Sequence, residues 1–175
     1  MNPRHRRLQT DYQRIMTGFV GHPYVTVEPV GPLPPERYRV IYGVPGLRLD
    51  AANQIQRVYQ HVVEIYLPAG YPREKPYCTV AQPVFHPNFG AHICIADFWS
   101  PSQSLLDVIV QIGDMLQYKL FNTRSPLNAV AARWVVEHVD ELPLASLDLF
   151  PLEPEITLHA VSASASAPSL GVDRP

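Results

Sequence analysis

The sequence has few cysteines, few lysines and no long apolar run. Its 175 residues include only two cysteines, Cys78 and Cys94, which are too few for a disulfide scaffold or a four-cysteine zinc site. No segment approaches the roughly 20 consecutive apolar residues of a membrane helix, and no apolar run follows the basic N-terminus as it would in a signal peptide. We therefore expect a cytoplasmic protein with free thiols and no membrane partner.

The sequence also lacks a large excess of either positive or negative charge. The net charge is -2 and the isoelectric point is near 6.4, whereas nucleic-acid binders usually show a basic surplus or stripe. We expect no nucleic-acid partner and favour a protein or small-molecule partner. Only Lys75 and Lys119 among the 14 basic residues are lysines, and this arginine bias, with many alanines and prolines, suggests a GC-rich, bacterial genome.

The apolar pattern predicts one α+β domain. Helical spacing over the first twenty residues indicates an amphipathic helix ended by Gly21 and Pro23. Four runs with strand character follow without intervening helices, which predicts an antiparallel meander sheet. These runs lie at 24–28, 38–42, 58–67 and 77–81.

Two further helices are predicted after an irregular segment at 85–101. Ser100 and Pro101, with Gln103 as a capping-box partner, have the pattern of a helix start. Ser125 and Pro126 repeat that pattern. The domain is expected to span residues 1–142, and we expect residues 143–175, which include an Ala/Ser tract, to be a largely flexible extension.

Three short motifs lie in the predicted loop between the sheet and the second helix. They are His86-Pro87-Asn88, Ile93-Cys94-Ile95 and Trp99-Ser100-Pro101, flanked by Tyr71-Pro72 upstream and by the segment from Asn122 to Leu127 downstream. Their types and order resemble the ubiquitin-conjugating enzyme family, whose active-site loop has His-Pro-Asn, then the catalytic cysteine, then Trp-Ser-Pro. The resemblance spans roughly residues 4–138.

The resemblance implies a fold, a chemistry and partners. The implied fold has an N-terminal helix, a four-stranded meander, an active-site loop and a central helix, here with one further helix instead of two. The implied partners are a ubiquitin-like modifier, its activating enzyme and a target protein. Arg73 stands where many members have an aromatic residue for docking ligases, which argues against a conventional RING ligase. A bacterial source would make this an operon-type member with a role in antiphage defence.

Cys94 is the predicted thioester carrier, because a thiolate both accepts an acyl chain and releases it to an amine. Asn88 is the predicted oxyanion donor, with a purely architectural turn role as the alternative. His86 is expected to fix the loop. Cys78, inside an apolar strand, is expected to be core.

Two further residues are candidates near the incoming amine. Ser125 falls where the family often has an acidic residue, although it also suits a helix cap, and Asp97 offers a carboxylate three residues after the cysteine. His92 is an alternative base. We expect no cofactor, and a zinc site at His86, His92 and Cys94 is disfavoured because it has only three ligands.

The resemblance implies that the activating enzyme docks on the basic face of the first helix, at Arg4, Arg6, Arg7 and Arg14; a merely solvated basic face is the alternative. Two other functions stay open. The chain would be a binding module if it recruits a modifier without catalysis, or a Cys/His hydrolase if a histidine activates the thiol.

Overall fold

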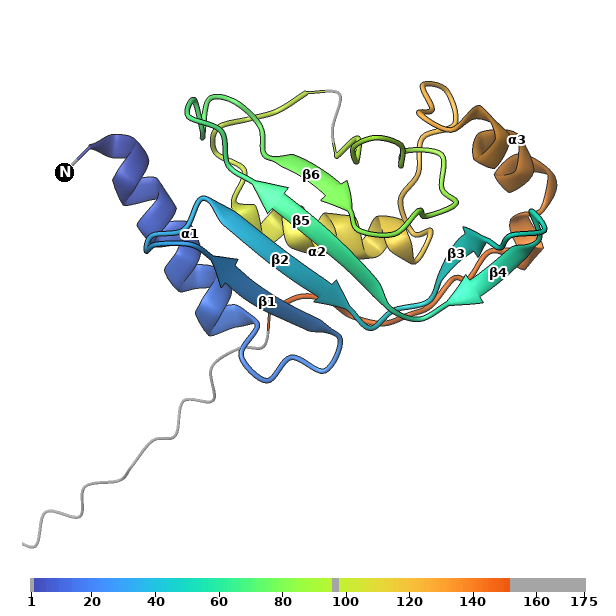
Figure 1. Ribbon diagram of the computed structural model, residues 1–175, viewed down its shortest axis with the longest axis horizontal. Coiled ribbons are helices and arrows are strands. Elements are labelled where there is room, and N and C mark those ends of the chain that lie inside the picture. Colours follow the sequence, from blue (N-terminus) through green and yellow to red (C-terminus); the bar gives the residue numbers. More distant parts are fainter. Residues whose placement is uncertain (1, 96–97, 152–175) are drawn as a thin grey trace, which may run out of the picture.

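The computed structural model describes residues 2–95 and 98–151. A helix precedes a run of strands, and two helices and a short 3-10 helix follow (Figure 1). The elements are α1 (Pro3–Gly18), β1 (Val25–Val30), β2 (Arg37–Tyr42), β3 (Gly46–Leu49), β4 (Ile55–Val58), β5 (His61–Tyr66), β6 (Tyr77–Val80), α2 (Leu105–Leu116), α3 (Ala129–Glu137) and η1 (Val139–Glu141). This order confirms the predicted α+β fold.

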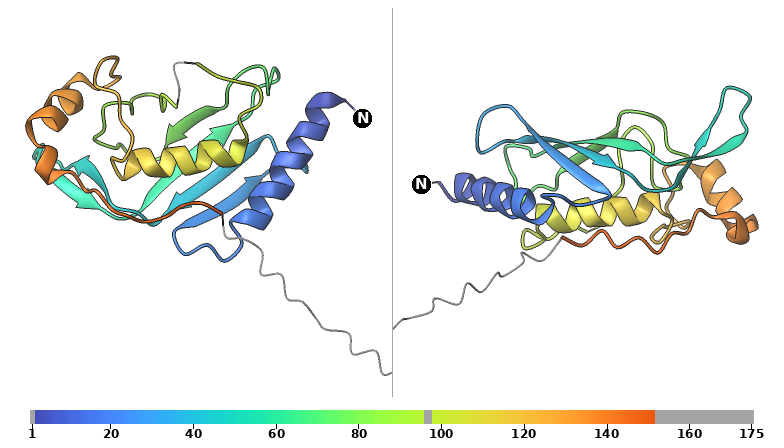
Figure 2. Two further views of the ribbon diagram at one scale, coloured as in Figure 1. Left: turned by 180° about the vertical axis from the view of Figure 1, so that it is seen from behind. Right: turned by 90° about the horizontal axis from the view of Figure 1, so that it is seen from below.

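The main sheet is a four-stranded antiparallel meander in the order β1-β2-β5-β6. Its register brings Val27, Val40, Val63 and Val80 opposite one another across the four strands, and Val40 and Val63 are completely buried. Because strand side chains alternate between faces, this row defines the inner face. Helices α1 and α2 cover that face (Figure 2).

Helix α2 lies at the centre of the core. Its Leu105, Ile109, Ile112 and Leu116 are fully buried. The hydroxyl of Tyr42 on β2 donates to the Ile109 carbonyl at 2.8 Å and links the helix to the sheet.

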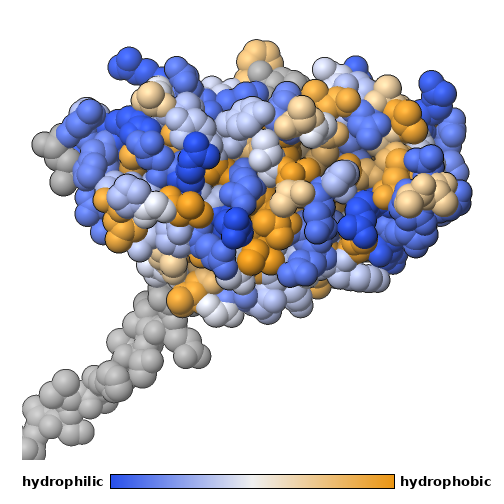
Figure 3. Space-filling model, in the orientation of Figure 1, coloured by the Kyte–Doolittle hydropathy of each residue, from blue (hydrophilic) through white to orange (hydrophobic). Residues whose placement is uncertain are grey.

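The other face of the sheet has no helix over it among the described residues. Figure 3 shows this face as a mixture of hydrophilic and hydrophobic residues. Arg39 and Glu64 form an ion pair there at 2.9 Å, and the Arg37 guanidinium lies 4.6 Å from the centre of the Tyr66 ring.

The third predicted strand, 58–67, is wrong in its extent. The chain forms two strands there, β4 and β5, which are separated at residues 59 and 60. β4 pairs with β3 in a separate hairpin, whereas β5 pairs with β2 and β6. Tyr59 is 63% exposed and does not share the buried side of Val63, Ile65 and Leu67. The change of pairing partner ends one strand and begins the next.

The predicted cap of α2 is also corrected. Ser104, not Ser100, caps the helix, and it forms a reciprocal capping box with Asp107. Pro101 lies instead in a turn, which the Gln103 amide closes by donating to the Ser100 carbonyl at 3.0 Å. The box satisfies the first amides of α2, and residues 100–103 are left to contact α1.

Helix α3 begins later than predicted. Its cap is Asn128, whose side chain accepts from the Ala131 amide at 3.0 Å. Ser125 is exposed in the preceding loop. The amides of Leu127 and Asn128 both donate to the Pro87 carbonyl, at 2.8 and 3.0 Å. These bonds hold residues 127 and 128 against Pro87, and the helix begins after Asn128.

Residues 143–151, the first part of the predicted extension, lie along the domain. Leu149 is buried against Gly113 of α2. The Lys119 amine donates to the Leu147 carbonyl at 2.5 Å, and the His22 ring bonds the Phe150 carbonyl at 3.2 Å. Residues 152–175 lie outside the described residues, so the predicted boundary stays a prediction. Within 2–95 and 98–151, no helix has both the length and the apolar character required to cross a bilayer.

Candidate active site

The two cysteines lie in opposite environments. Cys78, on β6, is 1% exposed, and burial raises the pKa of its thiol to about 12. Cys94 is partly exposed and lines a pocket of about 220 Å³. Because the thiolate is the nucleophile, Cys94 is the candidate reactive thiol. The pocket is lined by Asn88, Cys94, Ile95, Gln111, Met115, Leu120, Phe121 and Asn122.

Cys94 is presented by two buried neighbours. Ile93 and Ile95 are each 3% exposed and belong to the core. The Ile93 amide donates to the Cys78 carbonyl at 2.8 Å, which fixes the segment to β6. The Cys94 amide donates to the Asn88 carbonyl at 2.9 Å. The side chain between the two isoleucines is consequently directed to the pocket.

The Asn88 side chain joins the cysteine loop to the segment after α2. Its Oδ1 accepts from the Asn122 amide at 2.7 Å, and its Nδ2 donates to the Asn122 carbonyl at 3.0 Å. An amide NH₂ group has a second N–H donor. Asn88 has an architectural contact and also the chemical capacity for the predicted oxyanion contact.

His86 is completely buried beneath this contact. Its Nδ1 accepts from the Asn88 amide at 3.0 Å, so its Nε2 carries the proton and donates to the Leu120 carbonyl at 3.2 Å. Burial lowers the pKa of His86 to about 4. With both ring nitrogens engaged, His86 is placed to hold the loop and not to accept a proton from Cys94. We call His86, Asn88 and the backbone of Leu120 and Asn122 the histidine cluster.

Two predicted residues, Ser125 and His92, do not line this pocket. Ser125 is exposed in the loop before α3 and does not line the pocket. The His92 ring stacks on Tyr77 of β6 with centroids 6.1 Å apart. Asp97 lies outside the described residues, so its predicted role is not tested. Within the described ranges, no group of three or more metal-ligating side chains is found.

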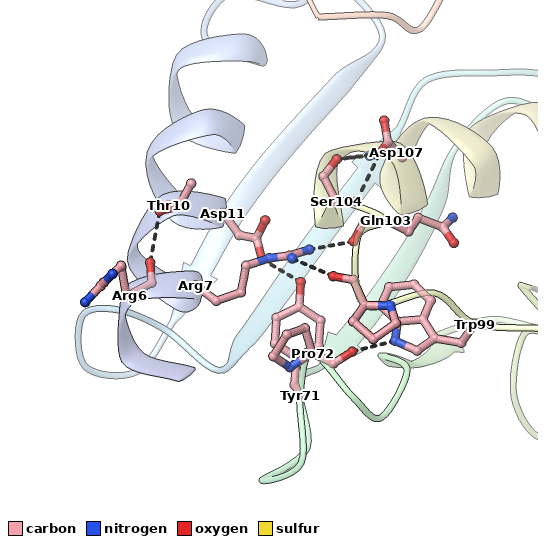
Figure 4. A network of polar contacts seen from close by, with 11 residues as sticks. Arg6, Arg7, Thr10, Asp11, Tyr71, Pro72, Trp99, Gln103, Ser104 and Asp107 are labelled. Carbon is pink, nitrogen blue, oxygen red and sulfur yellow. Dashed lines mark hydrogen bonds and ion pairs between the residues drawn. The ribbon is translucent and has the colours of Figure 1, made fainter. Parts of the chain in front are cut away.

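A second cluster lies on the far side of the loop and begins on α1 (Figure 4). Arg7 Nε donates to the buried Asp11 at 2.7 Å, and the Tyr71 hydroxyl donates to the same carboxylate oxygen at 2.5 Å. Arg7 also donates to two backbone carbonyls before α2, those of Pro101 at 2.7 Å and Gln103 at 2.5 Å. We call Arg7, Asp11, Tyr71 and these carbonyls the arginine cluster.

Trp99 extends this side of the site. Its indole Nε1 donates to the Pro72 carbonyl at 2.7 Å, and its ring lies 6.4 Å from Tyr71 between centroids. The Trp-Ser-Pro and Tyr-Pro motifs are therefore neighbours in space, as Figure 4 shows. The loop after Cys94 is attached to both α1 and the turn before β6.

The four arginines predicted as one docking face divide into two pairs. Arg4 is engaged with Glu36 at 2.6 Å and with the Pro68 carbonyl at 3.1 Å, and Arg7 belongs to the arginine cluster. Arg6 and Arg14 are exposed. Arg4 and Arg7 therefore also contribute contacts within the fold, and the docking surface stays a prediction.

Gln111 is a site residue that the sequence interpretation missed. It lines the pocket from α2, and its Nε2 donates to the Ile95 carbonyl next to Cys94. Its Oε1 accepts from Gln103 Nε2 at 3.2 Å. A signal was present in the sequence, because Gln111 is a polar residue within the apolar run 108–112.

The fold and the site now define a class. A helix, a four-stranded meander and a cysteine-bearing loop before a central helix form the α+β fold of ubiquitin-conjugating enzymes. Residues 56–142 match the model of the family described as ubiquitin-conjugating enzyme.

A solved structure with similar topology has the same fold. It is the E2 domain of a Toxoplasma gondii ubiquitin conjugating enzyme, with a TM-score of 0.55 and 21% sequence identity; the alignment covers 77% of this chain and 88% of the other. No curated protein sequence matches this chain. The matches do not support the bacterial origin or the antiphage role predicted from composition.

Proposed function

We propose that this protein is a ubiquitin-conjugating enzyme that carries a ubiquitin-like modifier on Cys94 as a thioester and transfers it to an amine. The observation that carries the proposal is the position of Cys94. It is the partly exposed thiol of the chain, it lines a pocket with Asn88, and its backbone amide is bonded to Asn88. The family match over residues 56–142 supports this chemistry.

The proposed reaction has two exchanges at one carbonyl carbon. The Cys94 thiolate attacks the thioester carbonyl of the charged activating enzyme, and the enzyme's thiolate leaves. An amine of the target then attacks the new thioester, the C–S bond breaks, and the Cys94 thiolate is released as the amide forms. The amine loses its extra proton to solvent or to a base.

Asn88 is proposed to stabilise the oxyanion of the second exchange. One N–H of its amide donates to Asn122, which orients the group, and the other is available for a developing negative charge. The contact that positions the donor is thus the same contact that holds the loop. Ser125 and Asp97 stay proposed contributors near the amine.

The proposed partners are a ubiquitin-like modifier, an activating enzyme and a target protein. The family match implies the first two in general terms. Arg6 and Arg14 are the proposed docking residues on α1 because they are the exposed pair. Arg73 is exposed beside the Tyr71-Pro72 turn, and its charge disfavours a ligase that inserts this position into an apolar pocket.

The hydrolase alternative is less well supported. A cysteine hydrolase needs a base in contact with its thiol. His86 uses both ring nitrogens for backbone contacts, and His92 stacks on Tyr77. The binding-module alternative leaves the partly exposed Cys94 without a role.

The test is a charging assay with ubiquitin, a ubiquitin-activating enzyme and ATP. We expect an adduct that thiol reductant removes, that Cys94→Ala abolishes, and that Cys94→Ser converts to a reductant-stable oxyester. Cys78→Ala is the matched control, because that thiol is buried and the variant should still charge.

Each alternative predicts a different result. Binding of ubiquitin without any adduct would favour the binding module. Steady release of free ubiquitin from the charged enzyme, with no amine added, would favour the hydrolase. An adduct unchanged in Cys94→Ala would contradict the carrier assignment.

A further inference from the structure

A continuous series of hydrogen bonds connects α1 to the residue after Cys94. Arg7 Nη2 donates to the Gln103 carbonyl at 2.5 Å. The Gln103 side chain then donates to Gln111 Oε1 at 3.2 Å, and Gln111 Nε2 donates to the Ile95 carbonyl. The series crosses from the first helix to the central helix and ends beside the reactive thiol.

We propose that Gln111 is a positioning residue for Cys94, and that it links the cysteine segment to Arg7 of α1 through Gln103. The proposal rests on the proposed function for its effect on thioester transfer. Its effect on the Cys94 thiol itself is independent of any partner.

The backbone around Cys94 is held from two sides. On the N-terminal side of Cys94, its own backbone amide donates to the Asn88 carbonyl at 2.9 Å. After it, the Ile95 carbonyl accepts from Gln111. Removing the second contact leaves the segment attached through the first one and through the buried Ile95 side chain, so we expect greater local opening without global unfolding.

The amide of Gln111 is suited to this position because it is both an acceptor and a donor. Its oxygen faces Gln103 and its nitrogen faces Ile95. A carboxylate of the same shape would keep the acceptor and lose the donor. Gln111→Glu therefore isolates the contact with Ile95, while Gln103→Leu removes the connection toward Arg7 and leaves Gln111 in place.

The first measurement is the rate of Cys94 alkylation by iodoacetamide as a function of pH, followed by intact mass. Gln111→Glu and Gln111→Leu should raise the limiting rate about two- to tenfold, the range for loss of one net intramolecular hydrogen bond. Arg7→Ala should raise it in the same direction, and the Arg7→Ala/Gln111→Leu double variant should show less than the combined effect. An unchanged or lower rate in the Gln111 variants would overturn the proposal.

Two controls separate positioning from general destabilisation. Gln13→Leu removes an exposed amide on α1 that forms no hydrogen bond among the described residues, and it should alkylate like the native protein. Cys78, at 1% exposure, is an internal reporter of global opening and should stay unmodified. If the Gln111 variants fail to fold, Gln103→Leu provides the test, since Gln103 lies outside α2; an unchanged rate there overturns the link to Arg7.

The second measurement uses the charged enzyme. The Gln111 variants should discharge their thioester about two- to tenfold more slowly, with an unchanged KM for the amine acceptor. If no thioester forms on the native protein, the proposed function fails while the alkylation result still decides the positioning role. If charging occurs but neither alkylation nor discharge responds to Gln111, the positioning role fails and the proposed function stands.

Discussion

The histidine cluster and the arginine cluster hold the Cys94 loop at opposite ends by different means. His86 and Asn88 are neutral, 0% and 4% exposed, and bonded to the backbone of residues 120 and 122. Arg7 and Asp11 are an ion pair with side-chain exposures of 21% and 1%. One cluster joins the loop to the segment after α2, and the other joins it to α1.

The two clusters differ in charge and in exposure to solvent, and each suits its place in the fold. Neutral groups whose polar atoms each have a hydrogen-bond partner suit a buried position beside the thiol, since an unpaired charge there would be costly. An ion pair at the edge of the core keeps contact with solvent and with the helix proposed to receive the activating enzyme. The segment beside Cys94 can therefore be held in place while α1 stays accessible to a partner, because the two clusters are separate.

Acidification should give the largest change in stability, through the two buried histidines His86 and His61. Burial lowers the pKa of His86 from 6.5 to about 4, and that of His61 likewise to about 4. The unfolded chain therefore binds protons that the folded chain does not, so stability is full above pH 6.5 and falls as pH decreases toward 4. At pH 5 we expect a loss of about 2 kcal/mol per histidine, from about 1.36 kcal/mol per pH unit. Urea denaturation at pH 7 and pH 5 measures the summed loss in unfolding free energy from both histidines, about 4 kcal/mol.

The variant His86→Gln tests whether half of this pH-dependent loss of stability comes from the histidine cluster. His86→Gln should reduce the difference between pH 7 and pH 5 by about 2 kcal/mol, whatever its effect on stability at pH 7. Amide exchange at Leu127 and Asn128, which donate to Pro87, should increase at pH 5 before exchange near residue 103. An unaltered pH dependence in His86→Gln would show that His86 is not the titrating group.

Replacing Asn88 should separate its architectural role from its catalytic one. Asn88→Ala removes both bonds to the Asn122 backbone, and we expect a stability loss of about 2 kcal/mol. Loss of the proposed oxyanion donor should slow thioester discharge about 100-fold with charging largely retained. Urea denaturation and separate charging and discharge assays measure these effects.

Asn88→Asp is the informative companion variant. It keeps an oxygen that can accept from the Asn122 amide and removes every side-chain N–H. Discharge as slow as in Asn88→Ala supports the oxyanion role. Native discharge in either variant would leave Asn88 an architectural residue.

Local motifs were sufficient to place the central residues of the candidate site in one loop. The cysteine, Asn88 and His86 lie within nine residues of one another, and the I-C-I pattern already places the thiol opposite two apolar neighbours. The meander was predictable because its strands alternate and follow one another in sequence. The α2 cap was mislocated, although Ser104 and Asp107 have the spacing of a capping box, because Ser100-Pro101 offered a competing start.

Contacts between distant segments were not predictable in the same way. The helical pattern places Arg7 on a polar face, but the carbonyls it contacts lie 94 and 96 residues later. The β3-β4 hairpin was missed because its strands have four residues each, too few for a clear alternation. Gln111 was missed because a single polar residue in an apolar helix does not reveal which carbonyl it faces.

The smallest effect on stability should come from the arginines outside the arginine cluster. Arg6 and Arg14 are exposed on α1, and the Arg6→Glu/Arg14→Glu double variant should alter unfolding free energy by no more than about 0.5 kcal/mol per site. If these residues dock the activating enzyme, the variant should charge more slowly at low salt and lose much of the native salt dependence, because long-range attraction acts mainly on association rate. Charging rates across a salt series, with Arg6→Gln/Arg14→Gln as the neutral control, measure this.

Arg7→Ala should instead lower the free energy of unfolding, because it leaves the buried Asp11 carboxylate without its ion-pair partner. Equal charging rates for the native and charge-reversed proteins at every salt concentration would remove α1 as the docking surface and leave the arginine cluster with a role in the fold alone.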